Sequence, residues 1–568
     1  MKILTELKNE LTNIFKKLNL PENLVSLSFS DRPEVSDFQC NSAFALAKVL
    51  KKSPIEIASN IANEFKNKSF DVSVCNPGFI NFNLKEEFIK DTLKNLDESG
   101  NLLSDFHKPK KIVLDYGGPN VAKPLHVGHL RSAIIGESLK RLAKYFGDEV
   151  ISDVHLGDWG LQMGLTIAGL EEKFDLSYYS SKSTIKPNIT IDDLNQIYPA
   201  ASAKSKEDEN FKKHAQEITT KLQHKQEPYF SIWKDIRALS VEKIKEEYAK
   251  LNVSFDLYNG ESDSQIYVPK VFEILNSKNL IKLSDGAEIV EVAKEDDNSP
   301  MPPVIVKSSA GAGLYATTDI ATIIEREEKF NPDEIWYFTD NRQILHFQQV
   351  FRVCRLAQIG ENTKFFHCPF GTVNGADGKP FKTRDGGVMQ LGALIDLVTE
   401  KSNEKLKENN GEENKALAQN IGVSALKFGD FINFRAKDYN LDLDKFCSFD
   451  GKTGPYILYT IVRINSILTK AGEFEKDYSL KDSCTKNILI DLLKLSQELE
   501  LGYEQKSLSG ICQAAYNLAS DFSTIYSNVR ILNLTGDERN QYLTLINIIQ
   551  KTLSLVCEIL AINIPEKM

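Results

Sequence analysis

The sequence predicts an α/β fold built around a parallel sheet, with a small α+β domain before it and an all-helical domain after it. Between residues 110 and 370, short apolar strands alternate with amphipathic helices, the pattern of right-handed crossovers in a parallel sheet. Beyond Pro455, the apolar residues recur at helical spacing in every segment. The first 107 residues combine helical runs with one alternating strand.

The N-terminal segment 1–107 is predicted to be a separate α+β domain. Apolar residues recur at helical spacing from Ile3 to Leu18 and again in the run SAFALAKVL, while residues 78–84 (GFINFNL) alternate like a strand. Pro109 marks a linker, so a new domain is expected to begin near residue 108.

Residues 108–398 are predicted to form the α/β domain, in which ligands bind at the carboxyl ends of the strands. Residues 171–300 are polar and irregular, with lysine- and glutamate-rich helices around 204–250, and are interpreted as an insertion into the sheet. Strands are expected at 111–115, 149–154, 334–339 and 364–367, with helices at 130–146 and 342–358.

The remaining chain is predicted to be helical. Residues 399–452 are expected to form a linker with connecting helices, in which the charged run 400–415 is a low-complexity joint. Residues 453–568 are expected to form a helical bundle, with helices at 457–468, 488–499, 511–532 and 542–560.

Composition excludes several classes of protein. The 568 residues include 42% hydrophobic and 26% charged residues, an ordinary globular balance for three or four domains. The net charge of −10 argues against coating nucleic acid by bulk charge but not against a local basic groove. The eight cysteines are scattered, which excludes CxxC zinc and thioredoxin motifs and favours reduced thiols in a cytosol. No apolar stretch is long enough to span a membrane, and the first residues do not form a signal peptide.

The strongest motif is residues 120–132, NVAKPLHVGHLRS, between the first strand of the α/β domain and its helix. Backbone N–H groups and the helix dipole favour phosphate there, and Gly128 lets a flat ring approach the backbone. His126 and His129 can donate hydrogen bonds to phosphate oxygens whose charge grows in a transition state. The alternatives are two histidines that merely begin a helix, or a metal pair, for which no further ligand is present in the motif.

Residues 115–132 (DYGGPNVAKPLHVGHLRS) and 155–164 (HLGDWGLQMG) together resemble the arginyl-tRNA synthetases, class I aminoacyl-tRNA synthetases whose first signature is usually written HIGH. Only the insertion 171–300 lacks matching motifs. Four further segments resemble the family's N-terminal and helical anticodon-binding domains: 37–41, 76–82, 454–463 and 564–568.

The resemblance implies a class I synthetase with a Rossmann-like parallel sheet, an N-terminal α+β domain that contacts tRNA or braces the catalytic domain, and a helical anticodon-binding domain. It implies ATP-dependent activation of L-arginine to arginyl-adenylate, followed by transfer to the 3′-terminal adenosine of tRNA(Arg). ATP is expected to arrive with Mg²⁺, and no zinc is expected. The protein is expected to be a cytoplasmic monomer that does not bind membranes.

The second class I signature, usually KMSK, is altered in this chain. The loop reads KPFKTRDGG from Lys379, with Thr383 where the second lysine would stand, a departure that many arginyl enzymes share. A glycine-rich surface turn is the alternative interpretation of the loop. The resemblance suggests that Lys123, just upstream of the first signature, replaces the missing cation with the help of Lys382 and Arg384.

The implied catalytic groups are therefore His126, His129, Lys123, Lys382 and Arg384. The implied ATP-binding residues are Gly128, His126, His129, Lys379 and Lys382.

The guanidinium of arginine is planar and permanently charged, and it is best held by a bidentate carboxylate with neighbouring acceptors. Tyr315 and Asp319 are four apart, so they are neighbours if their segment is helical. Taken singly, such residues could be core packing, a capping acid or a solvent-facing amide. The family's arginine pocket maps onto Asp115, Asn120, His126, Tyr315, Asp319 and Gln343.

The helical domain is expected to read RNA through its shape and its unstacked bases. Tyr456, Tyr459 and Arg463 lie at its entry, and Tyr526 and Arg530 cluster later, so they could stack on or pair with loop bases. Aromatic residues in a helical bundle are more often core residues, so packing is the alternative for these positions.

Three rival functions are less compatible with the sequence. Another class I synthetase would show a zinc site or an editing domain, and a small-molecule nucleotidyltransferase would not need the helical bundle beyond Pro455. A catalytically inactive tRNA-binding relative would not need both histidines and the basic loop.

Overall fold

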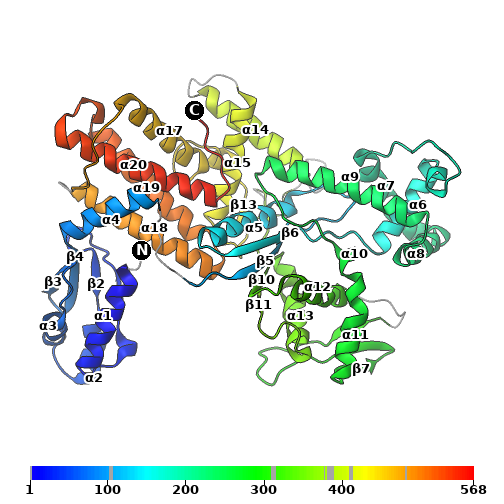
Figure 1. Ribbon diagram of the computed structural model, residues 1–568, viewed down its shortest axis with the longest axis horizontal. Helices are drawn as coiled ribbons and strands as arrows, with labels where there is room; N and C mark the ends of the chain where they lie inside the picture. Colours follow the sequence, from blue (N-terminus) through cyan, green and yellow to red (C-terminus); the bar gives the residue numbers. More distant parts are fainter. Residues whose placement is uncertain are drawn as a thin grey trace. The chain divides into compact units, whose positions relative to one another are not determined.

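The computed structural model describes residues 3–100, 107–308, 315–375, 378–379, 381, 389–408, 414–479 and 483–568. The chain divides into two compact units (Figure 1). Unit 1 comprises Met1–Lys108, Ser448–Glu558 and Ile564–Met568, and unit 2 comprises Pro109–Cys447 and Ile559–Asn563.

Unit 2 is built on a four-stranded parallel sheet with the order β11-β10-β5-β6 (Figure 1). Helix α5 follows β5, and α13 connects β10 to β11, so the predicted parallel sheet with crossover helices is confirmed. The elements are β5 (Lys111–Tyr116), α5 (Val127–Tyr145), β6 (Glu149–Asp153), β10 (Glu334–Phe338), α13 (Ile344–Ala357) and β11 (Lys364–His367).

The strands are apolar because helices cover the sheet. Val113, Ile335 and Tyr337 are buried in one core with Ile320, Ile324 and Val350 of the helices. Ser132 on α5 joins two strands, because its Oγ accepts from the Gly117 N–H and donates to the Phe338 carbonyl, each at 2.7 Å. The start of α5 is thereby fixed above the carboxyl ends of β5 and β10.

A long excursion separates β6 from β10. It contains the expected helices and also a three-stranded antiparallel sheet, β7-β8-β9, that the sequence did not predict. Its elements are α6 (Leu161–Lys173), η2 (Ser177–Ser180), α7 (Ile191–Glu207), α8 (Glu209–Gln223), α9 (Tyr229–Lys250), α10 (Glu261–Ser264), η3 (Gln265–Tyr267), α11 (Val268–Ser277), β7 (Ile281–Ser284), β8 (Ala287–Val290), β9 (Val304–Lys307) and α12 (Tyr315–Phe330).

The predicted charged joint at 400–415 is wrong for residues 400–408, which form the end of α14 (Leu391–Glu408). Ser402 and Leu406, one turn apart, are buried, and Lys405 forms an ion pair with Glu408 at 2.7 Å. Residues 409–413 lie outside the described residues. The unit continues with η4 (Asn341–Gln343), β12 (Val373–Asn374), α15 (Lys415–Phe431), β13 (Tyr439–Asn440) and α16 (Leu443–Phe446).

Unit 1 joins an antiparallel sheet, order β1-β2-β4-β3, to the C-terminal helices. Its elements are α1 (Ile3–Lys17), η1 (Glu22–Leu24), β1 (Leu27–Phe29), β2 (Phe38–Cys40), α2 (Ser42–Leu50), α3 (Pro54–Glu64), β3 (Phe70–Cys75), β4 (Phe79–Leu84), α4 (Glu86–Ser99), α17 (Gly454–Ala471), α18 (Ser483–Gln505), α19 (Ser509–Asn528), η5 (Ile531–Asn533) and α20 (Gly536–Ile559).

Buried Asp97 at the end of α4 links the two parts of unit 1. Its carboxylate accepts from Lys551 at 2.7 Å, from Asn547 at 2.8 Å and from Tyr478 at 3.0 Å, and it pairs with Lys476 at 3.0 Å. Despite the opposing effect of burial, these partners lower the pKa of Asp97. The N-terminal sheet and the helical bundle therefore share one compact unit.

Helix α20 is long and apolar enough by composition to cross a membrane. Most of its apolar window is buried inside the protein, as in the core helix of a soluble bundle, so it is weak evidence for a membrane span.

Candidate active site

The two signature histidines cap helix α5 with their own side chains. His126 Nδ1 accepts from the Gly128 N–H at 3.0 Å, and His129 Nδ1 accepts from the His126 N–H at 3.0 Å. The arrangement is a capping box in which imidazoles replace the usual Ser and Glu. Both rings are therefore fixed at the helix N-terminus, with their centroids 3.9 Å apart.

This geometry sets the protonation of both rings. Because Nδ1 accepts a backbone hydrogen in each, the proton of the neutral imidazole is on Nε2. Burial and the nearby ammonium of Lys123 lower the pKa of His126. Burial and the neighbouring His126 lower the pKa of His129 to about 3. At pH 7 the pair thus offers two neutral Nε2–H donors.

The segment that follows the second signature is hydrogen-bonded to the first signature. The Val127 N–H donates to the Met389 carbonyl at 3.0 Å, and the Leu391 N–H donates to the Leu125 carbonyl at 2.9 Å. His126 and Gln390 form the antiparallel bridge between them. The glycine-rich loop therefore ends against the loop that carries His126.

The described residues include little of that second loop. Lys379 is exposed, and its carbonyl accepts from the Gly375 N–H at 2.8 Å. Lys382, Thr383 and Arg384 lie outside the described residues.

Lys123 lies against the insertion. Its ammonium is 4.3 Å from the centroid of the Tyr198 ring on α7. Since Lys123 also lowers the pKa of both signature histidines, its charge lies close to them.

Arg131 of the first motif has a structural role that the sequence did not reveal. Its buried guanidinium donates to Asp430 Oδ2 at 2.7 Å and to the carbonyls of Gly371 and Lys437 at 2.7 and 3.0 Å. It ties α5 to α15 and to the segments that flank β12 and β13.

Of the expected arginine-pocket residues, Asp319 has the most informative partner. It lies on α12, and its Oδ2 is 2.5 Å from His346 Nε2 on α13. Tyr315 begins α12 and is 76% exposed, so it is not a core residue. Gln343 is exposed in η4, three residues before His346. Sequence reasoning missed His346. Its spacing of three residues from Gln343 could have indicated it, because residues three apart in a helix lie on the same face.

Asp115 is already paired. Arg326 Nη2 lies 2.7 Å from Asp115 Oδ2 and 3.0 Å from Asp153 Oδ2, inside the protein. Burial raises the pKa of Asp115 against the opposing charge of Arg326. Although burial opposes it, the carboxylates of Asp153 and Asp115 raise the pKa of His155 to about 9. The guanidinium that Asp115 binds here is therefore the chain's own.

Glu261 is a second acid near Asp319, and the sequence did not single it out. Burial and the carboxylates of Asp158 and Asp319 raise its pKa to about 7, against the opposing effect of His155. It begins α10, and its N–H donates to the Leu156 carbonyl at 3.0 Å. It lies in the insertion, where no motif drew attention to it.

Asn120 is exposed and pairs with Gly157 through a parallel backbone bridge, its own loop running beside the one that follows β6. A Cβ on Gly157 would lie 2.1 Å from Asn120 Oδ1, so a larger residue at 157 would displace the Asn120 side chain.

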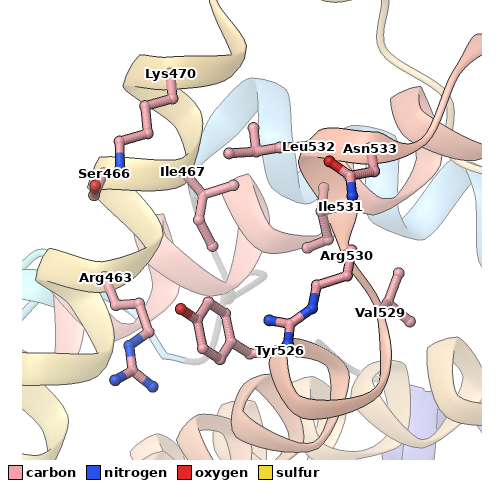
Figure 2. A pocket seen from close by; sticks show the side chains of 10 residues that line it. All are labelled: Arg463, Ser466, Ile467, Lys470, Tyr526, Val529, Arg530, Ile531, Leu532 and Asn533. Atoms are coloured by element: carbon pink, nitrogen blue, oxygen red, sulfur yellow. The ribbon is translucent and has the colours of Figure 1, made fainter.

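In unit 1, three of the five expected RNA-binding residues, Arg463, Tyr526 and Arg530, line a pocket of about 260 Å³ (Figure 2). The Arg463 guanidinium on α17 lies 4.2 Å from the Tyr459 ring and 4.4 Å from the Tyr526 ring. The sequence predicts one helix over 511–532, but α19 ends at Asn528 and the 3-10 helix η5 follows. The predicted end of this helix is therefore wrong. The pocket is lined by Arg463, Ser466, Ile467, Lys470, Tyr526, Val529, Arg530, Ile531, Leu532 and Asn533.

Tyr456 lies elsewhere in the bundle. Its hydroxyl hydrogen-bonds Ser523 Oγ on α19 at 2.8 Å, which supports the packing alternative for this residue. Within the described ranges, no group of three His, Cys, Asp or Glu side chains is arranged to hold a metal.

Comparison with known proteins identifies the family. The family model for the catalytic domain of class I tRNA synthetases (R) matches residues 92–443. The model of the DALR anticodon-binding domain matches 457–568, and that of the arginyl-tRNA synthetase N-terminal domain matches 1–84. The arginine–tRNA ligase of Alkaliphilus oremlandii is 42% identical over 98% of each chain. This chain belongs to the arginyl-tRNA synthetase family.

Further relatives agree. The arginine–tRNA ligase of Agathobacter rectalis is 41% identical over 100% of both chains. The fold is also that of the Plasmodium falciparum arginyl-tRNA synthetase, with a TM-score of 0.83 at 23% identity, covering 100% of this chain and 99% of the other. The Thermus thermophilus enzyme gives a TM-score of 0.77 at 20% identity, with both chains fully covered.

The expected family, fold and enzyme class are therefore confirmed, and the chain is an arginine–tRNA ligase. Its substrates are ATP, L-arginine and tRNA(Arg).

Proposed function

We propose that His126, His129, Lys123 and the 379–387 loop bind the triphosphate of ATP, while Asp319 and Glu261 hold the guanidinium of arginine. The observation that carries the assignment of the triphosphate site is the pair of backbone hydrogen bonds joining 125–127 to 389–391, since it fixes the end of one signature beside the other. Lys379, Lys382 and Arg384 supply the cations of the loop, and Gly128 admits the adenosine.

The arginine carboxylate attacks the α-phosphorus of ATP, and pyrophosphate leaves. A hydroxyl of the terminal adenosine of tRNA then attacks the adenylate carbonyl carbon, and AMP leaves. Because the substrates supply both nucleophiles, the chain contributes positioning and charge stabilisation. The Nε2–H groups of His126 and His129 donate to phosphate oxygens as their charge grows, without a proton transfer.

Mg²⁺ is proposed to accompany ATP. The described side chains at the signatures are a cation and neutral donors, which fits an ion held mainly by phosphate oxygens and water. When bound, it would neutralise charge on the triphosphate. No zinc is needed for this chemistry.

The guanidinium needs two acids and an aromatic surface. Asp319 supplies one carboxylate and exposed Tyr315 the ring, while the amides of Gln343 and Asn120 are assigned to the substrate's other polar groups. Glu261 supplies the second carboxylate, because Asp115 is engaged by Arg326. Asp115 then fixes the carboxyl end of β5 through its pair with Arg326. The ring of His126 faces the α-carboxylate of the bound arginine.

Lys123→Ala should depress arginyl-adenylate formation strongly, by tenfold or more, because a threonine at 383 cannot replace an ammonium beside the pyrophosphate. Thr383→Lys in that background should restore part of the rate. ATP–pyrophosphate exchange with tRNA present measures both.

Lys243→Ala is the matched control for Lys123, because Lys243 lines the same pocket but pairs with Glu247 at 3.1 Å. A Lys123→Ala exchange rate within about twofold of the parent, well under 1 kcal/mol, would remove Lys123 from the mechanism.

The raised pKa of Glu261 predicts that the KM for arginine depends on pH. With a pKa of about 7, its carboxyl is protonated and neutral at pH 6 and ionised at pH 8. Since the guanidinium binds the carboxylate, the KM for arginine should fall by up to about tenfold between pH 6 and pH 8. Glu261→Gln should make this profile flat.

The pKa of the neighbouring His155, about 9, lies above this window, and the pKa of His129, about 3, lies below it. A slope that persists in Glu261→Gln would assign the titration to a group other than Glu261.

The helical domain is proposed to bind the anticodon loop through Tyr459, Arg463, Tyr526 and Arg530. The basic, aromatic pocket of Figure 2 supports base stacking with phosphate contact. Tyr456 supports these residues from within the bundle.

The domain boundaries are proposed at 1–107, 108–398, 399–452 and 453–568. The N-terminal domain is proposed to contact tRNA or to brace the rest of the chain. The protein is proposed to act as a monomer in the cytoplasm, without membrane binding, like the soluble translation enzymes it resembles.

A further inference from the structure

The insertion contributes an aromatic ring to the surroundings of Lys123. Tyr198 lies on α7, and its ring centroid is 4.3 Å from Lys123 Nζ, within the range of a cation–π contact. Lys123 and α7 line one pocket of about 330 Å³, together with Gln390 after the second signature and residues of α9. The contact therefore lies where the insertion meets both signatures.

Helix α7, which carries the Tyr198 ring, is capped at its start and packed against α6. Thr190 and Asp193 form a capping box at its start, and Asp193 pairs with Lys173 of α6 at 2.6 Å. A Cβ on Gly169 of α6 would lie 2.5 Å from Ile197 Cγ2, so the two helices are in close contact beside Tyr198. The ring is thus held by a packed helix and not by a loop.

An aromatic ring suits a lysine that must act on phosphate. A carboxylate would hold the ammonium equally well but would neutralise the charge that the triphosphate needs. Two carboxylates, Asp192 and Glu247, line the same pocket, but among the described residues neither forms an ion pair with Lys123; Glu247 Oε1 is bonded to Lys250 at 2.8 Å and paired with Lys243 at 3.1 Å. Lys123 is instead placed on the ring and retains its charge.

From these contacts we propose that Tyr198 is a positioning residue for adenylate formation, which holds the Lys123 ammonium beside His126 and His129. This inference rests on the proposed role of Lys123. The free lysine side chain has many rotamers, and the ring restricts them to those near the signature histidines. The insertion 171–300 thereby contributes to adenylate formation.

The test compares Tyr198→Phe, which keeps the ring, with Tyr198→Leu and Tyr198→Met, which remove it. In ATP–pyrophosphate exchange with arginine and tRNA, the Leu and Met variants should lose about fivefold in kcat with an unchanged KM for arginine. The Phe variant should stay within about twofold of the parent. In a Lys123→Ala background, Tyr198→Leu should cause no further loss.

Each other outcome overturns the inference in a distinguishable way. A loss in Tyr198→Leu that persists in Lys123→Ala would make Tyr198 a structural residue. Parental or faster exchange in Tyr198→Leu, with Lys123→Ala strongly impaired, would overturn the positioning role alone. A harmless Lys123→Ala would overturn the proposed role of Lys123 and the inference together.

Discussion

His129→Ala should lower the rate of arginyl-adenylate formation about 100- to 1,000-fold, with a similar loss for His126→Ala. The reason is that each neutral ring offers an Nε2–H donor at the N-terminus of α5, where phosphate charge grows in the transition state. The KM for arginine and the affinity for tRNA should change much less. Pre-steady-state formation of the adenylate measures the effect directly.

Since His126 also caps the helix, the test must separate capping from catalysis. His126→Asn keeps an acceptor for the Gly128 N–H and loses the distant donor, so it should remain stable but slow. His126→Gln places its amide near the position of Nε2 and should recover part of the rate. His214→Ala on α8, outside the site, should match the parent. Near-normal turnover of His126→Asn would make His126 a purely structural residue.

Asp319→Asn should weaken arginine binding by about 2–4 kcal/mol, or roughly 30- to 1,000-fold in KM. The change keeps the size of the side chain and the contact with His346, but it removes the charge that faces the guanidinium. The KM for ATP should barely change. Steady-state exchange with varied arginine and varied ATP measures both constants.

Asp297→Asn is the matched control, because Asp297 also pairs with α13, through Arg352 at 2.5 Å, but lies outside the proposed pocket. Equal losses for arginine and ATP in Asp319→Asn would indicate misfolding. An unchanged KM for arginine would exclude Asp319 from the pocket.

Much of the fold could be predicted because the sheet of unit 2 is covered by helices. Strands such as Lys111–Tyr116 (KIVLDY) and Glu334–Phe338 (EIWYF) are apolar at most positions, so they stand out in the sequence. The end of α14, residues 400–408, could not be predicted. Its exposed face is charged, and only two buried residues, Ser402 and Leu406, mark its inner face. The sheet of β7, β8 and β9 could not be predicted, because its strands are short and half-exposed and so lack a clear apolar pattern.

The site was only partly accessible to sequence reasoning. The histidines could be found because their motif sits between a strand and a helix, where phosphate binding follows from local geometry. Glu261 and Tyr198 could not, because their proximity to Asp319 and Lys123 depends on how the insertion folds back. The pairing of Asp115 with Arg326, 211 residues away, could not be predicted either, because it has no local signal.

The most direct test of the account is ATP–pyrophosphate exchange with each of the amino acids in turn, with and without tRNA(Arg). The proposed pocket of Asp319, Glu261 and Tyr315 predicts exchange with arginine and at most trace exchange with lysine, whose compact ammonium cannot bind two carboxylates bidentately. Exchange driven equally by lysine or by an uncharged amino acid would contradict the assignment of this pocket.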